Sequence, residues 1–130
     1  KENNIMKKLV FYRCNHCGNI ITHTNNSGVP VVCCGEKMQL LEPNTVDASN
    51  EKHVPHVEVS GNKVKVTVGS VEHPMAEEHF IQWICVVSKE GIQIKWLKPN
   101  EKPVKEFVLN EGDELVEVYE YCNLHGLWKK

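Results

Sequence analysis

The chain has 130 residues, of which 41% are hydrophobic and 25% are charged, and its formal net charge is -2. This composition permits a packed core and excludes global disorder, while the lack of a basic excess argues against a general nucleic-acid binder. No apolar run reaches the roughly 18 residues that a membrane-spanning helix needs, so we expect neither a membrane nor a nucleic acid as partner.

The first 42 residues hold four of the six cysteines in the chain. A segment of this length rarely buries enough apolar surface to fold alone, so residues 1–42 are predicted to be a small domain built around a metal. Residues 43–50 are polar and rich in turn-forming side chains, which is typical of a linker. Residues 51–130 form the second predicted domain.

This second domain is predicted to consist of strands. Residues 57–59 and 64–68 alternate between apolar and polar side chains on either side of a Ser-Gly-Asn-Lys turn, which is a hairpin pattern. Residues 80–87 form an apolar run typical of a strand buried on both faces. Short strands between Gly, Pro and Asn turns, with no helical period, predict a mainly β fold, an antiparallel β-sandwich. Further strands are predicted over residues 92–96, 104–109 and 115–121.

The cysteines of the first domain have the spacing of metal ligands. Cys14-x-x-Cys17, followed by a glycine, is typical of a metal-binding turn, and Cys33-Cys34 supplies a second, vicinal pair. Four thiolates complete a tetrahedral shell for zinc or for iron, and thiolate chemistry alone does not decide between the two metals. Disulfides are the alternative, but with no secretory signal in view we expect a reducing, cytoplasmic location and favour a metal.

Five further potential ligands lie at strand ends or in connecting loops of the second domain. Cys122 and His125 form a C-x-x-H turn before a glycine, His73 and His79 bound a loop, and His53 is expected to open the first strand. Strand ends and loops of a sandwich converge at one rim, where these side chains can meet. Five ligands exceed the four of structural zinc but suit iron, so a reactive iron site with one open position is predicted.

Other candidate residues are predicted to have structural roles. His56 is three residues after His53, which in an extended strand places it on the opposite face, at the surface. Cys85 lies in an apolar run and is predicted to be a core thiol. Trp83 and Trp96 are predicted to be core aromatic residues rather than cofactor contacts.

The order of these motifs resembles the desulfoferrodoxin family, the two-iron form of superoxide reductase. Residues 12–20 and 32–38 are similar to its desulforedoxin-type iron domain. The resemblance covers nearly the whole chain. The similarity to the catalytic, neelaredoxin-like β-domain lies in residues 51–55, 68–75, 79–81 and 120–126.

The resemblance implies a rubredoxin/desulforedoxin-like domain followed by an immunoglobulin-like sandwich, each holding one iron. It implies that the first iron transfers electrons and that the second reduces superoxide to hydrogen peroxide. It also implies a homodimer and a rubredoxin-like electron donor. The implied ligands are Cys14, Cys17, Cys33 and Cys34 for the first iron, and His53, His73, His79, His125 and the axial Cys122 for the second.

Two charged residues directly before His53 gain a catalytic role from the resemblance. Lys52 is expected to raise the local concentration of the superoxide anion and to orient water for proton delivery. Glu51 is expected to bind the ferric iron and help displace product. Without the resemblance, both residues are typical of an ordinary exposed ion pair.

Two other functions stay open on the residues alone. One is a zinc-stabilised β-sandwich module that binds a partner. The other is a pure electron-transfer protein whose second iron is closed to external ligands. Metal content separates the first from the reductase, and binding of a small anion to the oxidised centre argues against the second.

Overall fold

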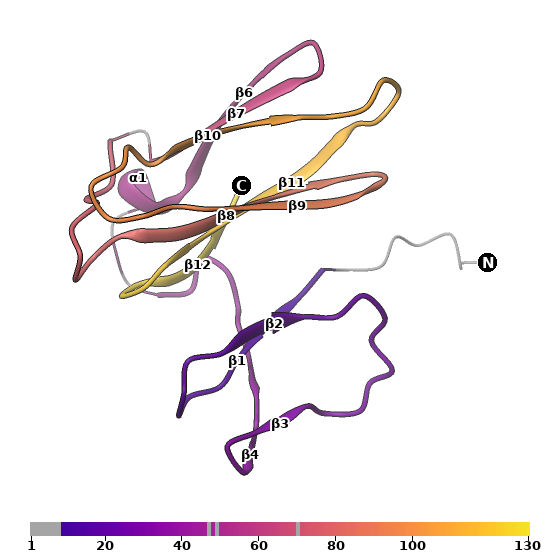
Figure 1. The fold of residues 1–130 in the computed structure, drawn as a ribbon, viewed down its shortest axis with the longest axis vertical. Coiled ribbons are helices and arrows are strands. Elements are labelled where there is room, and N and C mark those ends of the chain that lie inside the picture. Colours follow the sequence, from indigo (N-terminus) through magenta and orange to yellow (C-terminus); the bar gives the residue numbers. More distant parts are fainter. Residues whose placement is uncertain (1–8, 47, 49, 70) are drawn as a thin grey trace. The chain divides into compact units, whose positions relative to one another are not determined.

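The computed structural model describes residues 9–46, 48, 50–69 and 71–130 (Figure 1). Contacts within the chain separate two compact units, Lys1–Glu42 and Pro43–Lys130. The described strand pairs are antiparallel in both units, which confirms the predicted mainly β fold. Within the described residues, no helix is long and apolar enough to cross a membrane.

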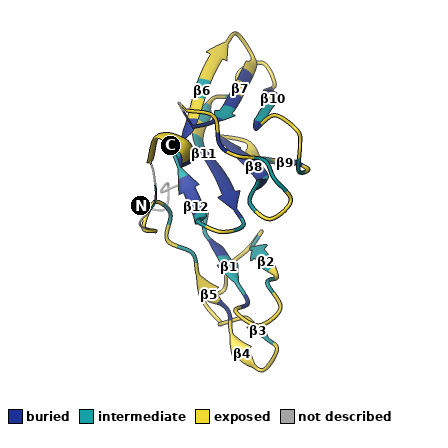
Figure 2. Cartoon of the chain, turned by 90° about the vertical axis from the view of Figure 1, so that its left-hand side faces the viewer, coloured by how far each residue is buried: buried dark blue, intermediate teal, exposed yellow. Residues whose placement is uncertain are grey.

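The first unit is built from very short strands. A three-stranded sheet has the order β2-β1-β5, and β3 pairs with β4 in a separate ladder. Among its described residues the buried apolar side chains are Phe11, Cys14 and Met38, and much of the rest is exposed (Figure 2). So small a core agrees with a unit that depends on a bound metal. The strands are β1 (Phe11–Arg13), β2 (Ile20–Thr22), β3 (Val32–Cys33), β4 (Glu36–Lys37) and β5 (Gln39–Leu40).

The second unit is a sandwich of two sheets. One sheet has three strands in the order β10-β7-β6, and the other has four in the order β12-β11-β8-β9. Three strands packed on four is the architecture of an immunoglobulin-like sandwich. The strands are β6 (Pro55–Ser60), β7 (Lys63–Val68), β8 (Ile81–Ser88), β9 (Gly91–Trp96), β10 (Val104–Val108), β11 (Leu115–Cys122) and β12 (Gly126–Lys129).

The core lies between these two sheets. The alternation of β7 places Val64, Val66 and Val68 on its inner face and leaves Lys63 and Lys65 exposed. Each fully buried branched side chain contributes roughly 1.5–3 kcal/mol of transfer free energy, so this face anchors the sandwich. The facing sheet contributes the buried side chains Ile81, Ile84, Val86 and Val118.

One predicted strand opening is a helix in the structure. His53 ends a single helical turn, α1 (Asn50–His53), and strand β6 starts only at Pro55. The turn closes through a hydrogen bond from the Val54 N–H to the Asn50 carbonyl oxygen, at 2.9 Å. Four residues are too few to produce a helical period, which is why the sequence pattern does not reveal the turn.

The structural roles predicted for four residues have mixed outcomes. Cys85 and Trp83 are buried on β8, and the His56 side chain is exposed on β6, as predicted. The prediction for Trp96 is wrong, because its side chain is 76% exposed. Trp96 pairs with the buried Trp83 of β8, but it lies on β9, an edge strand of the four-stranded sheet. An edge strand has a neighbouring strand on one side only, so the side chain of Trp96 is left open to solvent.

Gly69 follows β7 and packs directly against α1. Its φ is +84°, and a Cβ atom there would lie 2.7 Å from the carbonyl oxygens of Glu51 and Lys52 and closer still to that of Val71. The Gly69 N–H donates to the Val54 carbonyl at 3.2 Å, and the Val71 N–H donates to the Glu51 carbonyl at 2.9 Å. Only glycine combines this conformation with so close an approach, so Gly69 fixes where α1 sits on the sandwich.

We expect Gly69→Ala to destabilise the second unit and to displace α1. Gly112 is the matched control, because its φ is +88° but a Cβ atom added there would have no other atom within 4 Å. Gly112→Ala should lose only the stability that left-handed strain costs, about 1–2 kcal/mol. Gly69→Ala should lose more stability, because its Cβ atom also meets the backbone of α1. Denaturant titration gives both free energies of unfolding, and equal losses would contradict the packing role of Gly69.

Candidate metal centres

The four cysteines of the first unit bring their sulfur atoms to one place. The ligand atoms of Cys14, Cys17, Cys33 and Cys34 all lie within 4.8 Å of one another, and the Cys17 and Cys33 sulfurs are 3.6 Å apart. The vicinal pair turns toward this point through Cys34, whose φ of +53° is in the left-handed region, and through Gly35 at +79°. All six cysteines of the chain are free thiols.

Crowding of these thiols is visible in their pKa values. The backbone N–H of Cys17 approaches the Cys14 sulfur at 3.5 Å and is the main cause that lowers the pKa of Cys14 to about 6. Hydrogen bonding with Cys14, and then with Cys17, raises the pKa of Cys34 to about 12 and also raises that of Cys33. Four thiolates cannot form together without a cation between them, so the group fits a metal ion held by all four.

The second group is a closed cycle of four imidazoles around one point. The ring centroids are 4.6 Å apart for His53–His73, 4.7 Å for His73–His79, 5.0 Å for His79–His125 and 4.8 Å for His53–His125. Each neighbouring pair is nearly perpendicular, with interplanar angles of 78°, 83°, 78° and 89° in that order. The ligand atoms of these rings and of Cys122 lie within 4.8 Å of one another. The structure therefore brings together all five residues proposed for this site.

The nitrogen atoms inside the cycle are spaced as ligands of one ion. His53 Nε2 lies 3.1 Å from both His73 Nε2 and His125 Nδ1. Ligands at right angles on an ion with metal–nitrogen bonds of about 2.1 Å lie about 3.0 Å apart. His79 Nε2 is buried and has no hydrogen-bond partner in the described chain, and the Cys122 sulfur is 4.0 Å from His125 Nδ1. Imidazoles and a thiolate of this spacing fit a single iron ion.

Burial keeps the imidazoles in the form that binds a metal. It lowers the pKa of His73 to about 4, against the opposing effect of the Pro74 carbonyl oxygen, 2.6 Å from His73 Nδ1. Burial, followed by the charge of His125, also lowers the pKa of His79. Both rings are therefore neutral at pH 7, and the contact with Pro74 fixes the proton of His73 on Nδ1 and leaves Nε2 free to bind.

Three connections of the sandwich supply the five ligands. Helix α1 carries His53, the connection between β7 and β8 carries His73 and His79, Cys122 ends β11, and His125 lies in the turn between β11 and β12. Strands β8 and β11 pair along most of their length, which holds the second and third connections side by side. The ligands thus meet at one rim of the sandwich.

Asn123 ties two of these connections together. Its side-chain Oδ1 accepts a hydrogen bond from the Phe80 N–H at 2.9 Å, and its Nδ2 donates to the Glu78 carbonyl oxygen at 3.0 Å. These two bonds hold the backbone on both sides of His79. Sequence reasoning missed this role, and the only available sign was an amide side chain inside the C-x-x-H turn.

A carboxyl group is buried two residues before Cys122. Glu120 is fully buried, and neither of its side-chain oxygens has a hydrogen-bond partner among the described residues. Burial raises its pKa well above the ordinary range of a carboxyl group, so the fold favours the neutral acid. Nothing in the sequence distinguishes Glu120 from the exposed glutamates of the chain.

The two proposed catalytic residues are exposed on α1. The positive charge of Lys52 is one of the causes that lower the pKa of His79, so this charge acts on the imidazole cycle. Glu51 is not among the five grouped ligands. It lines a cavity of about 370 Å³ together with Asn50, Val54, Pro55, His56 and Lys130.

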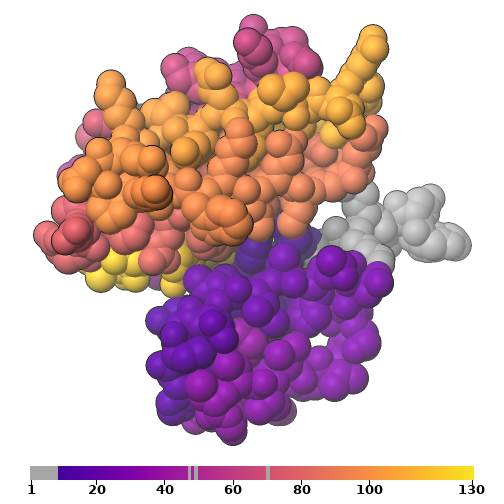
Figure 3. All heavy atoms as spheres, in the orientation of Figure 1, coloured from indigo at the N-terminus to yellow at the C-terminus, as the bar shows by residue number. Residues whose placement is uncertain are grey.

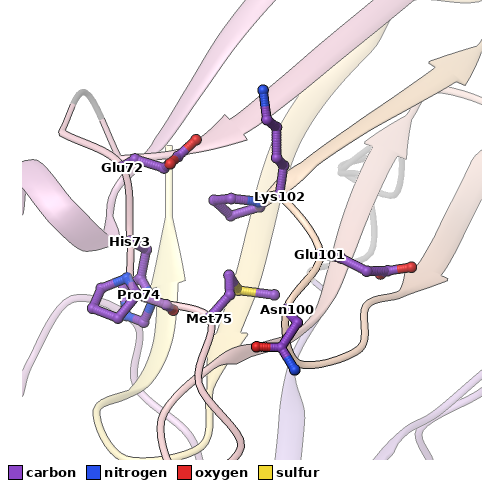
Figure 4. A pocket seen from close by; sticks show the side chains of 8 residues that line it. Glu72, His73, Pro74, Met75, Asn100, Glu101 and Lys102 are labelled. Carbon is purple, nitrogen blue, oxygen red and sulfur yellow. The ribbon is translucent and has the colours of Figure 1, made fainter.

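A second cavity, of about 340 Å³, lies beside His73. Figure 4 shows that the charged ends of Glu72, Glu101 and Lys102 point in different directions around it. No set of polar groups converges there on one ligand, so we assign the cavity no binding role. Figure 3 shows the heavy atoms of the chain from the same side as Figure 1.

Comparisons with known proteins agree with this arrangement. The family described as Desulfoferrodoxin matches residues 45–130, and Desulfoferrodoxin, N-terminal domain, matches residues 6–41. The chain is 49% identical over 118 residues to a desulfoferrodoxin of Nitratidesulfovibrio vulgaris, covering 91% of this chain and 92% of that protein.

Two solved structures have the same fold. The crystal structure of the superoxide reductase from Treponema pallidum is 41% identical, with a TM-score of 0.81, and the match covers 95% of this chain and 99% of that one. The superoxide reductase (1Fe-SOR) from Giardia intestinalis is 33% identical, with a TM-score of 0.54, over 62% of this chain and 95% of that one. The second match exceeds the length of the first unit, so it has to include part of the sandwich.

We expect Asn123→Ala to weaken metal binding at the imidazole cycle, because His79 loses the bonds on both sides. Asn44→Ala is the matched control: Asn44 makes the same pair of bonds, to the N–H and carbonyl of Lys129, without holding a ligand. Either change should cost about 1–3 kcal/mol of stability through the lost hydrogen bonds, and Asn44→Ala adds left-handed strain because the φ of Asn44 is +62°. Metal analysis should show loss of one metal per chain only for Asn123→Ala, and equal metal content in the two variants would contradict the role.

Proposed function

The chain belongs to the desulfoferrodoxin family, and we propose that it is a superoxide reductase, an oxidoreductase that converts superoxide to hydrogen peroxide. The reaction consumes one electron and two protons for each superoxide and releases no oxygen. The observation that carries this conclusion is the cycle of four imidazoles with the Cys122 thiol, alongside a separate four-cysteine group. Two relatives of similar fold whose names are superoxide reductase support it.

The two ligand groups fit two iron ions per chain. Iron held by these four imidazoles and the Cys122 thiolate would supply an electron to superoxide, and its ferrous form would carry a net charge of about +1 that attracts the anion. The protein's own contribution is to hold the four imidazoles convergent, with the Cys122 sulfur alongside, and to keep His73 and His79 neutral by burial. Because the pKa values of His73 and His79 are lowered, protons do not compete with iron for these rings at neutral pH.

Lys52 and Glu51 are the proposed catalytic residues. Lys52 is exposed, and its positive charge acts on His79 of the imidazole cycle. In its proposed role this charge raises the local concentration of superoxide and orients water that donates protons. Glu51 offers a carboxylate, a hard ligand that suits ferric iron and competes with the product. Because Glu51 is outside the ligand group, this role requires its side chain to turn toward the imidazole cycle while the backbone of α1, which carries His53, stays packed on Gly69.

We propose that residues 1–42 form a desulforedoxin-like domain whose four-cysteine iron relays electrons, that residues 43–50 are a linker, and that residues 51–130 form the catalytic domain. A rubredoxin-like protein is the proposed donor. Cys17 and Cys34 are exposed, and Val32 beside Cys33 is 62% exposed, which gives a small electron-transfer partner access to the sulfurs. A cytoplasmic location is proposed because thiolate ligands require reduced cysteines.

A homodimer is the proposed assembly. Ile92, Ile94 and Trp96 alternate along the edge strand β9, and all three are exposed. Such an apolar row is typical of a protein–protein interface, and a second copy of the chain is the proposed occupant. Sedimentation equilibrium tests this proposal: twice the mass of the chain is expected, and a monomer at micromolar concentration would contradict it.

Two measurements test the reductase against the alternative functions. Elemental analysis should find two irons per chain, whereas zinc in a colourless protein would favour a binding module. Stopped-flow mixing of the reduced protein with superoxide should oxidise the imidazole-bound iron at a rate near the diffusion-controlled range, with peroxide as product. If superoxide leaves that iron reduced, the chain is not a superoxide reductase.

We expect Lys52→Ala to slow the second-order reaction with superoxide by about tenfold and to flatten its dependence on ionic strength. Lys63→Ala is the matched control, because this substitution removes the same charge from an exposed residue at the end of β7 farthest from α1. Stopped-flow rates over a range of salt concentrations measure both effects. The same salt slope in Lys52→Ala and wild type would exclude steering by Lys52.

A further inference from the structure

Trp128 is a buried residue that contacts two ligand-bearing segments at once. It lies on β12, has no exposed surface, and pairs with Glu120 of β11. Its indole stacks on the imidazole of His53, with ring centroids 4.8 Å apart and an interplanar angle of 25°. Its Nε1–H donates a hydrogen bond to the carbonyl oxygen of His125 at 3.0 Å. No other described aromatic ring pair stacks a tryptophan on one of the grouped ligands.

The segment that carries His53 needs such a contact. Helix α1 is a single turn, and an isolated turn of four residues is not stable in water. Packing on Gly69 fixes the backbone of α1, but it does not set the plane of the His53 ring. The stacked indole does, because rotation of the imidazole away from a parallel plane would lose that contact.

The same indole also acts on His125, which is a neighbour of His53 in the imidazole cycle. His53 Nε2 and His125 Nδ1 are 3.1 Å apart although the two residues are separated by 72 positions in the sequence. The bond from Trp128 Nε1 restrains the backbone of His125, while the face of the ring restrains the side chain of His53. One rigid side chain therefore sets both ends of this contact.

We propose that Trp128 is a positioning residue of the imidazole-bound iron centre, which it controls by orienting His53 and anchoring His125. This inference rests on the proposed function only in assigning iron to the site. Groups that orient metal ligands from outside typically change metal affinity by about 10- to 100-fold when they are removed, and they shift the spectrum and potential of the metal. Trp128 is expected to have effects of this kind.

Two substitutions separate the two contacts. Trp128→Phe keeps an aromatic ring over His53 and loses the N–H, whereas Trp128→Leu loses both. Trp83→Leu is the matched control, because Trp83 is also a buried tryptophan of the same sheet but stacks on Tyr121, at 5.7 Å and 9°, rather than on a ligand. Each protein is loaded with iron, and the four-cysteine iron of the same chain serves as the internal reference.

The readouts are iron affinity by chelator competition, the electron paramagnetic resonance spectrum of the oxidised protein and the midpoint potential. Trp128→Leu should lower affinity at the imidazole site by about 10-fold or more and alter its spectrum and potential, with a smaller change in Trp128→Phe. Trp83→Leu should lower the melting temperature and leave the spectrum and potential of both irons unchanged.

Wild-type affinity, spectrum and potential in both folded Trp128 variants would overturn the proposal. If Trp128→Leu does not fold, an unaltered Trp128→Phe overturns it. Changes of equal size in Trp83→Leu would also overturn it, because they would show a general effect of core loosening. These readouts do not involve superoxide, so a wild-type protein that binds iron but fails to react with superoxide would reject the proposed function and leave the role of Trp128 standing.

Discussion

The contact on which the second unit depends is the approach of His53 Nε2 to two other ring nitrogens at 3.1 Å. An imidazole nitrogen carries at most one hydrogen, and His73 directs its Nδ1 proton to Pro74, so a single proton on His53 Nε2 cannot be donated fully to both His73 and His125. Protonation does not remove this restriction for His73, because burial lowers its pKa to about 4. A metal ion resolves the conflict because it accepts all the lone pairs at once.

The ligands come from weak local elements that are fixed by the rigid sandwich. Helix α1 is one turn long, and among the described residues of the loop that carries His73 and His79 the strand-like pairing is an isolated bridge between Ala76 and His79. Neither would hold a ring to within tenths of an ångström. The required order is supplied by side chains and backbone outside the ligand set: Gly69 under α1, Asn123 around His79, and Trp128 between His53 and His125. The Val-rich core between the sheets supports all three.

The sequence predicts the ligands better than it predicts what holds them. Spacing identifies Cys14, Cys17, Cys122 and His125, and alternation identifies strands such as β7, because these patterns are local. Helix α1 is too short to have a period, so its presence could not be read from the pattern. Trp96 belongs to an alternating strand, but alternation does not say that the strand is at an edge. The contacts of Asn123 and Trp128 join residues that are distant in sequence, and only the fold brings them together.

Anomalous diffraction at the iron absorption edge, from crystals of the iron-loaded protein, tests the central claim most directly. The account predicts one iron among four cysteine sulfurs and a second iron bonded to the ring nitrogens of His53, His73, His79 and His125 and to the Cys122 sulfur. An iron bound outside the imidazole cycle, or five such side chains that surround no metal when the four-cysteine site is filled, would contradict it.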